Sequence, residues 1–161
     1  MAKKTYNEKL NNPVGLPKIK DLTVKPEAVK RLGGVKMLIA APSQYNDIMA
    51  AIPGGKLTTV DRIRAHLAAQ AAADVTCPLT AGIFTNICAH ASEERGYDKI
   101  PWWRTLKING ELNEKYLNRL KDGGRVSLDL QEVFFTKCLG SLTDKFGLNW
   151  FVVYYPEAVN R

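Results

Sequence analysis

Long apolar runs, histidine and paired cysteines are scarce in this chain of 161 residues. No stretch approaches the roughly 18 consecutive apolar residues of a membrane span, and the first four residues, MAKK, lack the apolar segment of a secretory signal. We therefore expect a soluble, cytoplasmic protein with no membrane partner. Cys77, Cys88 and Cys138 form no CxxC pair, and the two histidines stand at no zinc-site spacing from a cysteine pair, so the sequence predicts no metal or other cofactor.

Positive charge, in contrast, is in excess. The chain has 23 Lys and Arg against 16 Asp and Glu, a net charge of +7, which favours a polyanionic partner such as nucleic acid or is simply a solubilising surface. Nine of the cations lie in residues 1–36, among prolines and a Gly33-Gly34 pair with little periodicity. We predict a basic amino-terminal arm over residues 1–36, either phosphate-contacting or merely solvated, extended except for a short helix from Pro26 to Leu32.

Residues 37–161 are predicted to form one domain that begins with a short strand near residues 37–40. Proline at a first helical position predicts helices starting at Pro42 and Pro78. Between them, Thr58 and Asp61 have the spacing of a capping box and predict a helix that runs to about Ala73. The apolar positions expected to face the core are Tyr45, Ile48, Met49 and Ile52 in the first helix, Val60, Ile63 and Leu67 in the second, and Leu79, Ile83, Phe84, Ile87 and Ala91 in the third.

The second half of the chain shows β signals. Asn109-Gly110 is a strong hairpin signal and predicts a wing after the helices. Residues 149–155 are aromatic and β-branched and predict a strand that pairs with this hairpin, while 128–139 is predicted to be helical. The fold class that follows is α/β (α+β), a winged helix-turn-helix-like domain with a basic amino-terminal arm and a carboxy-terminal strand.

Three motifs stand in order along the chain: IPGGKLTT at residues 52–59, IPWWR at 100–104 and GELNEKY at 110–116. Together they resemble the DNA-binding domain of the methylguanine-DNA methyltransferase family, in which the counterpart of residues 52–59 leads into a helix-turn-helix. Residues 100–104, IPWWR, stand in place of its Ile-Pro-Cys-His-Arg, and 110–116, GELNEKY, in place of its Gly-x-Leu-x-Gly-Tyr. Residues 77–84 and 103–107 resemble a branch of small proteins in that family. The resemblance implies that fold and a DNA-binding role.

Trp102 occupies the position of the family's reactive cysteine, and Trp103 that of its histidine. Since an indole N–H only donates a hydrogen bond, the pair supplies neither nucleophile nor general base, and we predict no catalytic residue at this site. Alkyltransferase-like proteins of the family also carry tryptophan at the first position and bind damaged DNA. Val60 and Leu79 are departures, because they fall where the family has its base-flipping tyrosine and its arginine.

The expected function is therefore non-catalytic recognition of DNA, with alkylated bases as the ligand in DNA repair and a repair protein as a further partner. A base would stack on the two indoles, the phosphate backbone would contact helix amino termini and basic residues, and the third helix offers few polar groups for base edges. The predicted pocket comprises Pro101, Trp102, Trp103 and Arg104; the backbone contacts are Thr58, Thr59, Arg62, Arg64 and Lys107; the recognition-helix residues are Thr80, Thr85 and Asn86.

Two alternatives remain open at this point. One is a protein-interaction module that kept the fold after losing its DNA contacts. The other is an alkyl acceptor that uses Cys77, Cys88 or Cys138; Cys77 precedes Pro78 at a predicted helix amino terminus, where a thiol pKa can fall. The sequence carries no signal for the oligomeric state.

Overall fold

The computed structural model describes residues 4–54, 56–96, 100–107, 122–134, 136–144 and 147–153. The helices in these ranges are α1 (Tyr6–Asn11), α2 (Pro26–Leu32), α3 (Pro42–Ala50), α4 (Val60–Gln70), α5 (Pro78–Arg95) and the 3-10 turn η1 (Trp102–Arg104). The strands are β1 (Lys18–Asp21), β2 (Lys36–Ile39), β3 (Thr58–Thr59), β4 (Val75–Thr76), β5 (Thr105–Leu106), β6 (Arg125–Val133), β7 (Thr136–Thr143) and β8 (Asn149–Val153).

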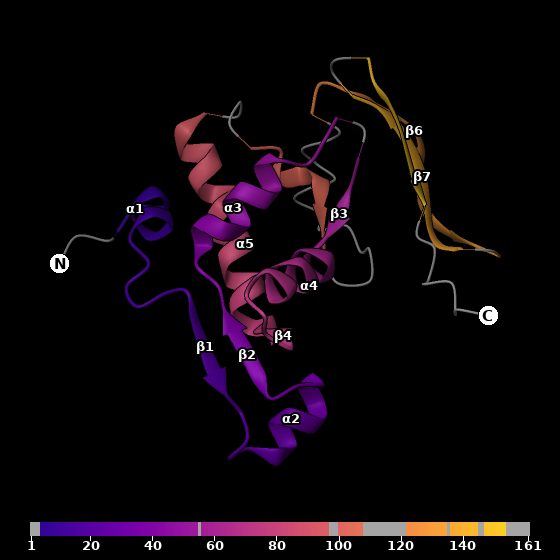
Figure 1. Ribbon diagram of the computed structural model, residues 1–161. Helices are drawn as coiled ribbons and strands as arrows, with labels where there is room; N and C mark the ends of the chain where they lie inside the picture. Colours follow the sequence, from indigo (N-terminus) through magenta and orange to yellow (C-terminus); the bar gives the residue numbers. More distant parts are fainter. Residues whose placement is uncertain are drawn as a thin grey trace.

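Helices α3, α4 and α5 pack together at the centre of the molecule (Figure 1). Helix α3 contributes Tyr45 and Met49, both 0% exposed, and α4 contributes Ile63 and Leu67, both 1% exposed. Each pair stands at i and i+4, so both side chains of a pair lie on one face of their helix. The predicted helix starts at Pro42 and Pro78 are confirmed, because proline tolerates the first turn, where its missing N–H has no partner to lose.

The inward face of α5 differs from the predicted apolar stripe. Leu79 and Ile83 are 73% and 49% exposed, whereas Phe84 and Ile87 are partly buried and Ala91 is buried. The side chains that α5 buries are small: Ala81, Thr85, Cys88, Ala89, Ala91 and Ser92. Bulky side chains of other elements, mainly Tyr45 and Trp102, fill the space beside these small residues. The small residues let the neighbouring elements pack close to the backbone of α5.

The amino-terminal segment folds against the helices instead of forming an extended arm. Helix α1 begins with a capping box between Thr5 and Glu8, a signal that the sequence prediction missed. The carboxylate of Glu94, near the end of α5, accepts hydrogen bonds from the backbone N–H groups of Tyr6 and Asn7, both at 2.9 Å. Leu10, 3% exposed, adds to the helical core. Helix α1 is thus docked on α5.

Strands β1, β2 and β4 form one sheet in which β2 is central, antiparallel to β1 and parallel to β4. The domain boundary expected at residue 36 falls inside β2, because Lys36 pairs with Asp21 of β1. Helix α2 occupies the predicted range from Pro26 to Leu32 and connects β1 to β2 at one end of the molecule (Figure 1).

A second, very short sheet joins two segments that are far apart in the chain. Strands β3 and β5 pair in parallel, with Thr58 opposite Thr105 and Thr59 opposite Leu106. This pairing places the residues that follow each strand, the first turn of α4 and Lys107, at the same end of the sheet. Sequence reasoning did not predict this pairing, since two-residue strands carry no periodicity.

The carboxy-terminal sheet, in the order β6-β7-β8, is antiparallel throughout. The helix predicted over 128–139 is wrong, because β6 and β7 cover that range. Burial in β6 alternates, with Val126 and Leu128 half-buried and Ser127 and Asp129 exposed, a period of two that marks a strand. The predicted carboxy-terminal strand is confirmed as β8, but it pairs with β7, and the Asn109-Gly110 hairpin lies outside the described residues.

These elements make an α+β fold of three small sheets and a central group of helices. Helices α4 and α5 follow one another, and the seven residues between them, 71–77, contain β4. A helix-turn-helix commonly has a turn of about three or four residues, so this connection is longer. None of the helices in the described part of the chain combines the length and the apolar character needed to cross a bilayer.

Candidate nucleic-acid interface

The tandem tryptophans lie at η1, between the helices and the carboxy-terminal sheet. Their rings meet edge to face, with centroids 5.9 Å apart and planes at 80°. Trp102 is 0% exposed and belongs to the helical core, whereas Trp103 is half-buried and contacts both that core and the cluster around Leu142 and Trp150. The expected stacking of a base on Trp102 is therefore not possible in this conformation, because neither face of its indole reaches the surface. Trp103 alone retains exposed surface.

The other two residues of the predicted pocket also support packing. Pro101 is half-buried and precedes η1 as its amino-terminal cap residue. The guanidinium of Arg104 donates from Nη1 to the carbonyl oxygen of Ile52 at 3.0 Å, which ties η1 to the end of α3. The four predicted pocket residues thus lie together, but Pro101, Trp102 and Arg104 serve to hold η1 in place.

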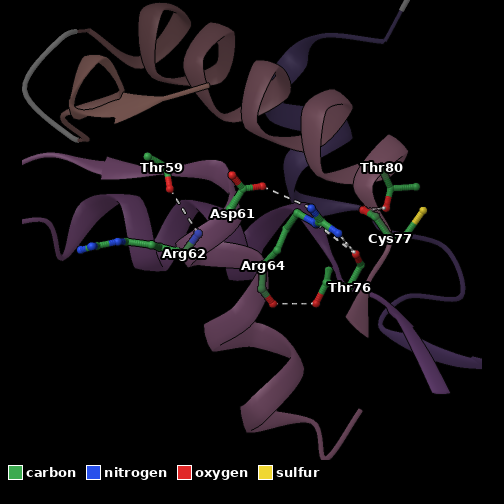
Figure 2. A network of polar contacts seen from close by, with 7 residues as sticks. All are labelled: Thr59, Asp61, Arg62, Arg64, Thr76, Cys77 and Thr80. Atoms are coloured by element: carbon green, nitrogen blue, oxygen red, sulfur yellow. Dashed lines mark hydrogen bonds and ion pairs between the residues drawn. The ribbon is translucent and has the colours of Figure 1, made fainter. Parts of the chain in front are cut away.

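The amino terminus of α4 is capped one residue later than predicted. The hydroxyl of Thr59, and not that of Thr58, accepts a hydrogen bond from the backbone N–H of Arg62 at 3.4 Å (Figure 2). Thr58 instead pairs in β3. Asp61 lies in the first turn of α4, where a carboxylate stabilises the positive end of the helix dipole.

Arg64 is committed to the fold. Its Nε and Nη2 donate to the carbonyl oxygen of Thr76 at 3.1 and 2.9 Å, and its Nη1 lies 3.3 Å from a carboxylate oxygen of Asp61. The hydroxyl of Thr76 in turn donates to the carbonyl oxygen of Arg64 at 2.8 Å. Figure 2 shows the guanidinium directed toward β4 and the start of α5. The predicted phosphate contact by Arg64 would require breaking this network.

Arg62 and Lys107, in contrast, are both exposed. In Figure 2 the side chain of Arg62 extends away from the Arg64 network. The parallel pairing of β3 with β5 brings Lys107, which directly follows Leu106, to the end of the sheet where α4 begins. Lys56, also exposed, precedes the other end of β3 and is a further cation that sequence reasoning missed. We name Arg62 and Lys107, with Thr58 and Thr59, the amino-end surface.

The chemistry of the amino-end surface suits an anion. The amino terminus of a helix carries a partial positive charge and presents backbone N–H groups, which favours phosphate oxygens. Cationic side chains around it hold a phosphate backbone without reading its sequence. The described part of the chain contains no group of three His, Cys, Asp or Glu side chains placed to ligate a metal.

Helix α5 presents little polar surface to a base edge. Thr85 is buried and donates to the carbonyl oxygens of Ala81 and Gly82, at 2.9 and 3.1 Å. Thr80 donates to the carbonyl oxygen of Cys77 at 3.3 Å, inside the first turn. Of the three predicted recognition residues only Asn86 is exposed, and base reading by Thr80 and Thr85 is not supported by this geometry.

Of the described cysteines, Cys88 is a poor nucleophile. Cys88 is 0% exposed, its thiol donates to the carbonyl oxygen of Pro42 at 3.3 Å, and burial raises its pKa to about 12. At neutral pH it is therefore a thiol, which is not the attacking species. Cys77 is half-buried at the start of α5. Cys138 lies in β7, and its side chain is outside the described residues.

Comparisons with known protein families, with curated proteins and with solved structures find no match for this chain. The candidate interface is therefore judged on its own geometry and charge. The amino-end surface is favoured over the tryptophan pair as a DNA contact, since both of its cations are exposed and Trp102 is not.

Proposed function

We propose that this protein binds duplex DNA without catalysis and that it contacts the phosphate backbone through the amino-end surface. The observation that carries the proposal is that the pairing of β3 with β5 brings Lys107 to the end of the sheet where α4, the helix of Arg62, begins. These two residues are 45 positions apart in the chain, and both side chains are exposed. Contacts of this kind depend on charge and not on base sequence.

The absence of catalysis is supported by the chemistry of the residues at η1. Trp102 and Trp103 lack a lone pair that could attack carbon or remove a proton at neutral pH. Their motif, IPWWR, resembles an alkyltransferase motif in which a cysteine and a histidine supply those groups. Cys88, the buried thiol of the helical core, is held in its protonated form, since its pKa is raised to about 12.

Recognition of an alkylated base, as a refinement of this proposal, depends on Trp103. This is the only indole of the pair with exposed surface, and it borders both the helical core and the carboxy-terminal sheet. A base stacked on one exposed indole face gains roughly 1 to 3 kcal/mol. We expect a preference for methylguanine-containing duplex to be lost in Trp103→Ala while binding of unmodified duplex persists.

The test of the main proposal is fluorescence anisotropy with a labelled duplex, with and without methylguanine. Binding should weaken as salt rises from about 50 to 200 mM, with a slope of roughly 0.9 per phosphate contact in a plot of log affinity against log salt. Arg62→Gln/Lys107→Gln should reduce this slope by about 2 and leave thermal unfolding unchanged. Failure of the wild-type protein to bind at the lowest salt would reject the proposal.

A protein-interaction module is the second candidate, and the exposed apolar residues of α5 favour it. Leu79 and Ile83, 73% and 49% exposed, stand at i and i+4 on the outer face of that helix. Apolar side chains gathered on one helix face are suited to a protein groove more than to a phosphate backbone. A partner retained by the wild type in a pull-down, absent with Leu79→Ser/Ile83→Ser and accompanied by no nucleic acid, would favour this candidate over DNA binding.

A further inference from the structure

A second concentration of positive charge lies at the other end of α4 from the amino-end surface. We define the basic unit as residues 18–36, which contain β1, α2 and the first residue of β2. All of its cations are exposed, and its acidic residues are only two, Asp21 and Glu27. The six cations are Lys18, Lys20, Lys25, Lys30, Arg31 and Lys36.

Among the described residues, the cations of the basic unit form no ion pair, although hydrogen bonds and, to a lesser extent, the charge of Lys36 lower the pKa of the Asp21 and Asp74 carboxylates. The ion pairs found among the described residues, Arg64 with Asp61 and His90 with Glu93, both lie outside the unit. Asp21 is occupied locally, because its carboxylate accepts from the backbone N–H of Thr23 at 2.7 Å and also from the Thr23 hydroxyl. Helix α2 buries none of its residues, so the unit offers its charge on several sides.

The basic unit is nevertheless held in a fixed place. The Asp74 carboxylate accepts from the backbone N–H groups of Val35 and Lys36, both at 2.8 Å, and the Asp74 N–H donates to the carbonyl oxygen of Lys36 at 2.9 Å. Leu22, 3% exposed, and the four-residue pairing of β1 with β2 complete the attachment. The cations are therefore carried by a folded element, and a partner would not have to order a loose chain.

The composition of the basic unit indicates which kind of polyanion it can bind. It has no aromatic residue, so it can neither stack on bases nor anchor at a membrane interface with Trp or Tyr. Its exposed apolar side chains, Ile19, Val24 and Val35, are aliphatic and small in number. Lysine and arginine without aromatics suit a phosphate backbone read by charge alone.

We infer that the basic unit is a second phosphate-binding surface, which lengthens the DNA contact beyond the amino-end surface. Asp74 ties the unit to the connection that follows the carboxyl end of α4, whereas Arg62 and Lys107 lie at its amino end. The 11 residues of α4, about 16 Å at 1.5 Å per residue, run from the first of these points to the second. This length corresponds to roughly five base pairs, which is well within the length of one bound duplex. The inference rests on the proposed function for the identity of the polyanion.

Three matched double variants test the inference, and each removes two exposed cations. Lys18→Gln/Lys20→Gln alters the basic unit, Arg62→Gln/Lys107→Gln alters the amino-end surface, and Lys4→Gln/Arg125→Gln, whose residues belong to neither, is the control for net charge. Affinity for a labelled duplex is measured by anisotropy over a salt series, and circular dichroism verifies folding. The basic-unit variant should lose on the order of 10- to 100-fold in affinity near 0.1 M salt, with a slope lower by about 2, and the control should retain most of both.

The outcomes separate the inference from the proposed function. Wild-type affinity and slope in the basic-unit variant, with binding weakened in the amino-end variant, overturn the inference and leave the proposed function standing. The reverse pattern supports the inference and rejects the amino-end surface. Equal losses in the control and the basic-unit variant overturn the inference, because net charge alone would explain them. Binding of anionic phospholipid vesicles but no duplex by the wild type rejects both, with a lipid surface as the partner.

Discussion

The helical core and the basic unit use positively charged residues in opposite ways. In the core, Arg64, Arg95 and Arg104 each donate to oxygen atoms of the protein itself. In the basic unit, six exposed cations stand beside Asp21, Glu27 and the neighbouring Asp74, and they take part in none of the ion pairs found among the described residues. The structure therefore distinguishes cations that hydrogen-bond within the fold from cations that remain available to a partner. The sequence shows both kinds only as lysine and arginine.

Trp102→Ala should have the largest effect on stability, because it removes a fully buried side chain from the helical core. The indole is 0% exposed and packs among α3, α5 and η1. Replacing a buried tryptophan with alanine costs about 3 to 5 kcal/mol of unfolding free energy. Urea unfolding measures the loss, with Trp103→Phe as a milder control at the half-buried neighbour. Unchanged stability would contradict the assignment of Trp102 to the core and reopen its role in binding a base.

Arg64 and Arg62 sharpen the comparison within one helix. Arg64→Ala leaves the carbonyl oxygen of Thr76 and the carboxylate of Asp61 without this partner, which should cost about 1 to 3 kcal/mol. Arg62→Ala removes an exposed side chain and should change stability by less than about 0.5 kcal/mol.

DNA binding should show the opposite order for these two variants. Arg62→Ala should weaken it, and Arg64→Ala, measured where the variant remains folded, should change it less. Thermal unfolding and anisotropy on the same preparations provide both readouts. Equal effects of the two variants on stability would refute the division between structural and available charge.

Gly34→Ala should disrupt the attachment of the basic unit to the rest of the fold. A Cβ at Gly34 would overlap with the Cβ of Asp74, whose carboxylate holds the backbone N–H groups of Val35 and Lys36. We expect a loss of about 1 to 3 kcal/mol from this overpacking. Gly82→Ala is the matched control, because a Cβ there meets open space on the outer side of α5 and should stabilise by about 0.5 to 1 kcal/mol. Opposite signs in thermal unfolding confirm the prediction, and equal signs contradict it.

Acid should loosen the attachment of α1 to α5. Hydrogen bonds from the backbone N–H groups of Tyr6 and Asn7 lower the pKa of Glu94 below its ordinary value of 4.5. Because the folded-state pKa is the lower one, this carboxylate stabilises the fold above the ordinary value, and the stabilisation is lost as pH falls through the folded-state pKa. The protection of the Tyr6 and Asn7 amides, measured as the exchange rate relative to that of an unfolded peptide at the same pH, should fall below about pH 4.5 in the wild type, and Glu94→Gln should remove that pH dependence.

The elements that the sequence predicted are those fixed by local chemistry. Helices starting at Pro26, Pro42 and Pro78 need only the proline ring and the residues that follow it. The strand at 149–153 needs only its aromatic and β-branched residues. The error over 128–139 is also local in origin, since the alternation from Val126 onward, typical of a strand, was available in the sequence.

The sequence allowed the residues of the candidate site to be named, but not the role of each residue. Sequence reasoning named Arg62, Arg64 and Lys107 together as backbone contacts. The structure separates them, because Arg64 donates to Thr76 twelve residues further on, whereas Lys107 reaches the start of α4 only through the pairing of β3 with β5. No spacing in the sequence shows which arginine will find an acceptor inside the fold.

By itself, the sequence determined the excess of positive charge, the start of most helices, and the lack of a nucleophile at the tryptophan pair, because each is a property of single residues or near neighbours. Tertiary structure decided that Trp102 is sealed, that Leu79 is exposed, and which cations remain available. The physical reason is that burial and ion pairing depend on residues brought together from distant parts of the chain, and each such contact forms only when packing supplies the partner.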